Sequence, residues 1–169
     1  MDKIKLAEIT TDPEILDELS KDKDRRVRYY IAYNSNTSPE TLDYLSRDKD
    51  SDVRWSVAAN PNTTPETLKQ MVIVEDYLSK NEDWVGGVRY YVAQNPNTSP
   101  ETLDYLSKDE SWPVRWSVAR NPNTTPETLK QMSIVEDDNS VKYHIKRNRN
   151  CSEETWKYLS ALEILSTLQ

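Results

Sequence analysis

The chain has 169 residues, of which 36% are hydrophobic and 30% are charged, and its formal net charge is −7 at pH 7. This length suffices for one domain with a contiguous core, and the acidic balance disfavours non-specific binding to nucleic acid or to anionic membranes. No apolar run reaches the length of a membrane span, and residues 1–24 lack the apolar stretch of a signal peptide. The single Cys151 excludes an internal disulfide and a cysteine-rich metal site, so we expect a cytoplasmic protein without a cofactor.

Residues 1–26 are expected to form a capping half-repeat at the N-terminal end. Residues 12–16 (DPEIL) are similar to residues 38–42 (SPETL), which belong to a unit that recurs further along the chain. The apolar residues that precede them would cover the open end of a stack. Terminal units of repeat proteins are commonly atypical in this way.

From residue 27 onward one phrase recurs, a Val-Arg-aromatic run followed by Asn-x-Asn-Thr and Pro-Glu-Thr-Leu. A period of roughly 26 residues is typical of a solenoid, in which each unit buries its apolar face against its neighbours. We therefore predict an all-α solenoid of short helical pairs, with about five repeats and terminal caps. The five copies begin at Val27, Val53, Val88, Val114 and Val141, the last of them decayed.

Each repeat is predicted to contain two short helices. In the second copy the first helix is expected to end at Asn60, because Asn tolerates the left-handed conformation and the proline that follows disfavours helix. The second helix is expected to begin around Pro65, which suits a first helical turn. Thr63 and Glu66 stand three residues apart, which is the pattern of a capping box.

The sequence also contains a longer repeat, which spans two of the shorter ones. Residues 27–76 match residues 88–137 at roughly 40 of 50 positions, as a tandem duplication would produce. The four repeats of residues 27–140 are separated by an insertion near residues 72–87, which holds both glycines, Gly86 and Gly87. We interpret this insertion as a lengthened helix plus a loop.

Residues 141–169 are expected to form a degenerate repeat and a C-terminal capping helix, within a single domain overall. Cys151 stands at the position of Thr63, so we interpret it as a structural substitution rather than a nucleophile. Apolar residues then follow at helical spacing: Trp156, Leu159, Leu162, Leu165 and Leu168.

The phrase Val-Arg-x-x-Val-Ala-x-Asn-Pro-Asn-Thr-x-Pro-Glu-Thr-Leu resembles the variant leucine-rich repeat proteins of bacteria, over roughly residues 12–160. The resemblance implies a right-handed superhelix that alternates α-helices with shorter, often 3₁₀, helices. One protein of that family carries an iron–sulfur cluster in a cysteine-rich N-terminal segment, which has no counterpart here. The Val-Arg part is also similar to armadillo and HEAT repeats, which mostly bind proteins.

Arg28, Arg54, Arg89 and Arg115 occupy one fixed place in four repeats, which favours a structural ladder over a groove that grips anions. In a ladder each arginine would bond to carbonyls at a helix end or to an Asp of the neighbouring unit. The paired asparagines, such as Asn60 and Asn62, are attributed to turn and capping chemistry.

An aromatic column is the candidate binding surface. It lies two residues after the core valine, at the flank of the first helix, where Tyr and Trp give a large contact area at low entropy cost. The alternative is that these rings only widen a thin core. The column consists of Tyr29, Trp55, Tyr90, Trp116 and Tyr143, and the residues four further on, Tyr33, Ala59, Gln94, Arg120 and Arg147, would share the ridge.

A non-catalytic module that binds a protein or peptide is the favoured function, because one His and one Cys make no familiar enzyme site. Acidic clusters such as Glu75-Asp76 and Glu136-Asp137-Asp138 favour a basic partner. A nucleic-acid-related role remains as an alternative, either through the basic run of residues 142–149 or by acidic mimicry. A third possibility is an oligomeric structural protein, and the chain is expected to be a monomer or a weak homo-oligomer.

Overall fold

The computed structural model describes residues 2–78 and 87–166. Within these ranges the chain forms twelve α-helices and no strand, so the prediction of an all-α repeat fold is confirmed. The chain divides into two compact units, unit 1 (Met1–Thr98) and unit 2 (Ser99–Gln169), where the sequence indicates one domain. No helix in the described ranges has the length and apolar character needed to cross a bilayer.

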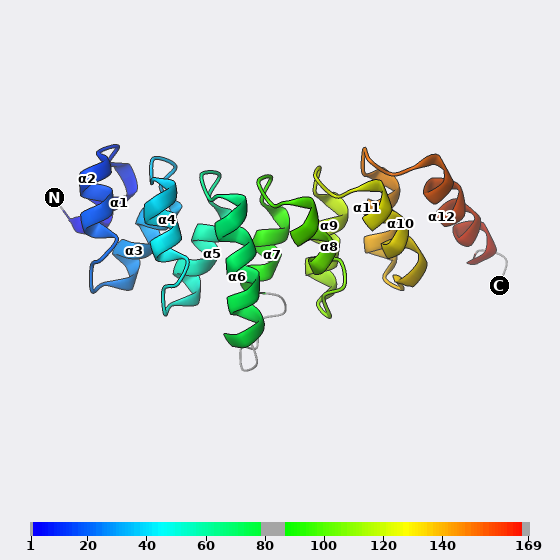
Figure 1. The fold of residues 1–169 in the computed structure, drawn as a ribbon, viewed down its shortest axis with the longest axis horizontal. Coiled ribbons are helices and arrows are strands. Elements are labelled where there is room, and N and C mark those ends of the chain that lie inside the picture. The colour runs from blue at the N-terminus through cyan, green and yellow to red at the C-terminus, as the bar shows by residue number, and fades with distance from the viewer. Residues whose placement is uncertain (1, 79–86, 167–169) are drawn as a thin grey trace. The chain divides into compact units, whose positions relative to one another are not determined.

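Unit 1 consists of helical pairs in which the first helices pack against one another along the array (Figure 1). The first helices are α1 (Lys3–Ile9), α3 (Arg25–Tyr33), α5 (Ser51–Ala59) and α7 (Gly87–Gln94). The second helices are α2 (Pro13–Leu19), α4 (Pro39–Leu45) and α6 (Pro65–Leu78).

Unit 2 repeats the arrangement with five helices (Figure 1). Helices α9 and α11 pack together as first helices, and α10 and α12 lie against α11. The five are α8 (Pro100–Leu106), α9 (Trp112–Arg120), α10 (Pro126–Val135), α11 (Asn139–Arg147) and α12 (Glu153–Ser166).

The second helices begin at proline, as the sequence indicates. The residue before the proline is the N-cap: the Thr64 hydroxyl accepts from the backbone N–H of Thr67 at 3.1 Å, which satisfies one of the free donors of the first turn. The expected capping role of Thr63 is therefore wrong. Thr63 is fully buried, and its hydroxyl instead donates to the backbone carbonyl of Val57 in the preceding helix.

The first helices end at asparagine, but the predicted left-handed conformation is wrong. Asn60 is extended, with φ −72° and ψ 130°, and none of the described residues other than glycine has a positive φ. Proline at position 61 favours this conformation, because its ring disfavours helix for the preceding residue. It is not required, since Asn34 and Asn148 are extended before Ser35 and Arg149. The one positive φ occurs at Gly87, at the start of α7.

The short second helices are α-helical rather than 3₁₀. Seven residues are enough for α-type bonds in α4, from the Leu42 N–H to the Ser38 carbonyl and from the Ser46 N–H to the Leu42 carbonyl. Tighter bonds, of the 3₁₀ type, are confined to the turn after the helix, where the Asp48 N–H donates to the Leu45 carbonyl.

The core is a row of aliphatic side chains between the first and second helices of the repeats. Val53 and Val57 of α5 are completely buried, as are Leu42 and Leu45 of α4. The repeat of α3 and α4 buries Val27, Ile31, Leu42 and Leu45, and the repeat of α5 and α6 buries Val53, Val57, Leu68 and Met71. The thin core explains how a chain with 36% hydrophobic residues is packed throughout.

The terminal segments differ from what the sequence indicates. Residues 3–19 form a complete helical pair rather than half of one, and α1 packs on α3 through the buried Ala7. In α12 only Leu159 of the predicted apolar row is fully buried, and Leu165 is 59% exposed. Leu168 and most of the expected loop of the insertion lie outside the described residues, whereas α6 is lengthened to 14 residues as predicted.

Candidate interaction surface

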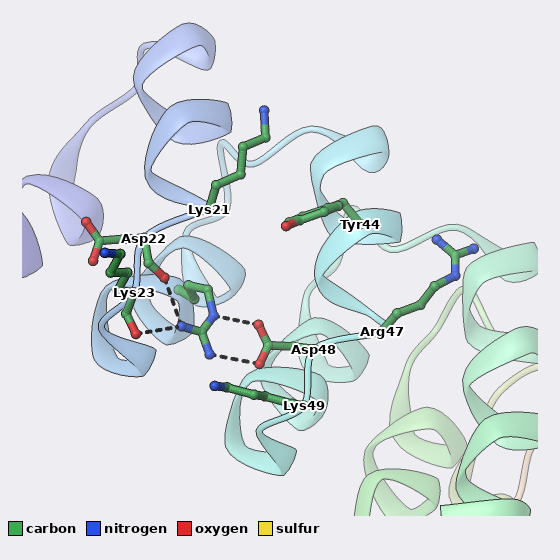
Figure 2. A pocket seen from close by; sticks show the side chains of 8 residues that line it. Lys21, Asp22, Lys23, Tyr44, Arg47, Asp48 and Lys49 are labelled. Atoms are coloured by element: carbon green, nitrogen blue, oxygen red, sulfur yellow. Dashed lines mark hydrogen bonds and ion pairs between the residues drawn. The ribbon is translucent and has the colours of Figure 1, made fainter.

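The repeated arginines lie on the first helices, and their side chains reach backbone carbonyls of the turn before the helix. The Arg28 guanidinium donates to both carboxylate oxygens of Asp48, at 2.6 and 3.0 Å, and to the backbone carbonyls of Asp22 and Lys23. Figure 2 labels these three partners. Both charged side chains are about nine-tenths buried. Burial alone would raise the pKa of Asp48, but the hydrogen bonds from Arg28 and from the Asp50 N–H and the guanidinium charge hold it below its ordinary range.

Two further arginines bond in the same way, but to glutamates. Arg54 donates to Glu75 at 2.6 Å, and both side chains are 4% exposed. Arg115 donates to both oxygens of Glu136, at 2.8 and 3.0 Å. Arg89 occupies the corresponding place in α7 and is half-buried. Arg28, Arg54 and Arg115 thus bond to partners within the fold, in the way that a structural ladder predicts.

A pocket of about 530 Å³ surrounds Arg28 (Figure 2). Lys21 and Arg47 line it, but Lys21 pairs with Asp17 at 2.8 Å and Arg47 pairs with Asp43 at 2.9 Å. Figure 2 shows Lys21 and Arg47 pointing in different directions rather than toward one point. This pocket therefore does not gather its cations around a common ligand.

The asparagines link repeats as well as forming turns. Asn60 donates from its side-chain amide to the carbonyls of Ala32 and Asn34, at 2.7 and 3.0 Å, and accepts from the Asn62 N–H. Asn148 repeats the pattern in unit 2, with the carbonyls of Ala119 and Asn121. These amides are thus committed to the stacking of repeats.

In unit 1 the aromatic column forms a continuous surface across three first helices. The rings of Tyr29 and Trp55 meet edge to face at 5.5 Å, and Trp55 stacks on Tyr91 at 4.9 Å. Tyr33 lies parallel to Tyr29 at 6.4 Å and is 63% exposed. Tyr90 stands edge to face with Tyr91 at 5.1 Å. The inner rings are half-buried between repeats, so the column serves both as packing and as surface.

A groove of about 600 Å³ adjoins this column in unit 1. Tyr33 and Ile9, both more than half exposed, line it together with Ala59 and Pro61. Ser56 also lines it and is only 1% exposed, and among the described residues its hydroxyl has no hydrogen-bond partner. A buried hydroxyl without a partner is costly, and this oxygen has less than 1 Å² of exposed surface, so a ligand would reach it only through a shift of the groove wall.

In unit 2 the column is built differently. Trp116 packs against His144 at 5.1 Å, and His144 packs against Tyr143 at 5.2 Å. Arg120 lies over the Trp116 ring at 4.4 Å, and Arg147 lies over the Tyr143 ring at 4.6 Å. Gln94, the corresponding residue of α7 in unit 1, is exposed.

The sequence did not assign a role to the residue that follows each column position. Tyr91 and His144, not Tyr90 and Tyr143, make the ring contacts with the tryptophan of the preceding repeat, and Ser56 stands at that same position in α5. The alternation of Tyr-Tyr with Trp-Ser along the repeats indicates such a contact, because a large residue opposite a small one fills the space between neighbouring repeats.

Several side chains of the acidic and basic runs are paired within the fold. Glu75 and Glu136 are buried partners of arginines, so they are not available to a basic partner. In the basic run, Lys146 pairs with Glu163 at 2.7 Å and lies over the Trp156 ring, away from Arg147 on Tyr143. Among the described residues no cluster of three or more His, Cys, Asp or Glu is placed to hold a metal ion.

Comparison with known proteins gives one consistent result. No family model matches the chain, and no curated protein is similar in sequence. Three solved chains are similar, among them a leucine-rich repeat variant described as having a novel repetitive structural motif, with 27% identity and a TM-score of 0.61. The helical repeat is similar to that of a leucine-rich repeat variant. The likeness covers 84% of this chain and 52% of that one, so the chain spans about half the length of that relative.

Proposed function

We propose that the protein is a non-catalytic repeat module that binds a segment of a partner protein along the aromatic column of unit 1 and its adjoining groove. The observation that supports this most directly is the groove wall, where two exposed side chains, Tyr33 and Ile9, stand beside Ser56, whose hydroxyl has no hydrogen-bond partner within the described part of the chain. Concave surfaces that combine aromatic side chains with a few polar groups suit peptide binding.

The partner's chemistry follows from the lining. The aromatic and apolar lining residues favour an apolar or aromatic side chain, and Ser56 would offer a hydrogen bond to a polar group once the groove wall shifts. A generally basic partner gains less support, because Glu75 and Glu136 are used inside the fold. Glu8, on the groove rim, already pairs with Lys5.

The test separates the exposed ring from the packed ones. Trp55 is a poor choice, because it packs between Tyr29 and Tyr91 and its loss would disturb the stack. Tyr33→Ser removes an exposed ring, and Tyr44→Ser is its matched control, because Tyr44 is 54% exposed on α4 and does not line the groove. In affinity capture from the native lysate, Tyr33→Ser should lose proteins that the wild type and Tyr44→Ser retain. Equal capture by all three baits would contradict the proposal.

A homo-oligomer is the second candidate, supported by the exposed end of the last described helix. Ile164 and Leu165 of α12 are 62% and 59% exposed. Sedimentation over a concentration series would reveal self-association, and Leu165→Glu should then abolish it by placing a charge in the contact. A constant monomer mass would dismiss this candidate.

A further inference from the structure

Two arginines of unit 2 lie over aromatic rings. The Arg120 guanidinium lies 4.4 Å from the centre of the Trp116 ring, and that of Arg147 lies 4.6 Å from the centre of the Tyr143 ring. Each arginine follows its ring by four residues on the same helix, which places the two side chains next to each other. A guanidinium that stacks on a ring keeps its N–H edge free for a planar acceptor.

His144 joins the two stacked pairs into one group. Its ring stands edge to face with Trp116 on one side, at 80°, and with Tyr143 on the other, at 88°. Trp116 and Arg120 come from α9, and the remaining three residues come from α11. The arginine–aromatic cluster, as we name it, consists of Trp116, Arg120, Tyr143, His144 and Arg147.

The positive charge of this cluster is not compensated. Arg120 and Arg147 form no ion pair with a carboxylate in the part of the chain that the structure describes, although Arg115, Lys130 and Lys146 of the same unit do. Burial lowers the pKa of His144, and the charges of both arginines lower it further.

The cluster is specific to unit 2, although the duplicated segments are otherwise alike. The corresponding ridge positions of unit 1 are held by Tyr33, Ala59 and Gln94, none of which is charged. The matched tryptophan, Trp55, packs against Tyr91 where Trp116 packs against His144. Stacking of the repeats therefore does not require arginine at this position.

We propose that the arginine–aromatic cluster binds a carboxylate of a partner protein, carried by an Asp or Glu side chain or by a chain end. This proposal rests on the proposed function, because it assumes that the protein binds a partner. It names the chemical group of that partner that would contact the ridge residues of unit 2. Arginine binds a carboxylate through two parallel N–H···O bonds, and the neighbouring rings provide apolar contact for the rest of the segment. The group bound at this site is therefore an acid, even though the protein itself has a net negative charge.

Nucleic acid fits the cluster less well than a carboxylate. Binding to a phosphate backbone depends on several cationic contacts, and the other cations of the basic run are turned elsewhere, Lys146 toward Glu163. A single carboxylate needs only the two guanidiniums.

The lone histidine makes the test direct, because the chain has a single histidine and its ring signals need no assignment among others. We would titrate the full chain with an acetylated, amidated tetraglutamate peptide at low salt and follow the His144 ring signals by NMR. A bound carboxylate should shift these signals with saturation and raise the His144 pKa, because a nearby negative charge favours the imidazolium. Arg120→Gln and Arg147→Gln should each weaken binding by about tenfold.

Matched variants make the outcome decisive. Arg120→Gln introduces the residue found at the equivalent position of α7, Gln94, so the fold should be retained. Arg149→Gln removes the same charge from the adjoining turn, outside the cluster, and should leave binding within about twofold. No saturating shift, an equal loss in Arg149→Gln, or tighter binding of a thymidine oligonucleotide than of the peptide would each overturn the proposal.

The two proposals fail separately. If Tyr33→Ser abolishes capture of a partner while Arg120→Gln leaves peptide binding unchanged, the binding module stands and the carboxylate site falls. If tetraglutamate binds the cluster but Tyr33→Ser captures the same proteins as wild type, the groove of unit 1 is not the partner surface.

Discussion

At the scale of single residues, stability depends on polar side chains that reach from one repeat to the next. Asn60 is 3% exposed and makes three hydrogen bonds, two of them to carbonyls of the preceding repeat. Asn62, two residues later, donates to the carbonyls of Ser35 and Thr37 but is exposed. Loss of the asparagine side chain should therefore cost more stability at position 60 than at position 62, because only the buried residue lacks access to water.

Asn60→Ala should destabilise the protein by about 2–4 kcal/mol, because buried carbonyls and an N–H lose their partners at once. Urea denaturation followed by circular dichroism measures the change. Asn62→Ala is the control and should cost about 1 kcal/mol or less, since water replaces the lost bonds. Equal losses in the two variants would show that the amide bonds between repeats are not the source of the effect.

These residues also show where prediction from sequence stops. The prolines that begin second helices and the Val and Leu positions of the core follow from local rules, and the structure has them where they were expected. The partner of Arg54 is Glu75, 21 residues away, and no local pattern distinguishes Glu75 from an exposed acid. The cap was assigned to Thr63 instead of Thr64 because both are threonines, and only the backbone conformation separates them.

At the scale of elements, one threonine closes the turn between the two helices of a repeat. The hydroxyls of Thr37, Thr63 and Thr124 each donate to the carbonyl six residues earlier, and all three side chains are completely buried. In the last repeat this position is Cys151, whose sulfur makes only a weak contact, at 3.6 Å, with the Ser152 carbonyl. Burial raises the pKa of the Cys151 thiol, so thiolate chemistry is disfavoured there.

Cys151→Thr should stabilise the protein by about 1 kcal/mol, because a threonine hydroxyl at this position can donate to the carbonyl of Ile145 as it does in the other repeats. Differential scanning calorimetry measures the gain as a rise in Tm. Cys151→Ala is the control, since it removes the sulfur without adding a donor, and it should give no rise. A similar Tm for both variants would mean that the threonine bond does not hold this turn.

At the scale of the whole molecule, the duplication provides the same side chain in two settings. Leu42 of unit 1 and Leu103 of unit 2 occupy matched positions and are both completely buried. In a repeat array, the stability is approximately the sum of the intrinsic stabilities of the repeats and of the interfaces between neighbours. A destabilising substitution therefore acts most strongly on its own repeat and the adjoining ones.

Leu42→Ala and Leu103→Ala should each cost about 2–5 kcal/mol, because the cavity forms in a thin core with few side chains to refill it. Hydrogen exchange, measured helix by helix, tests how far each lesion spreads. We expect Leu42→Ala to expose amides most in α3 to α5 and Leu103→Ala to expose them most in α8 and α9, since these elements hold the substituted leucines or pack on them. Uniform loss of protection over all described helices in both variants would show that the two units unfold as one cooperative body, and the nearest-neighbour account of this fold would fail.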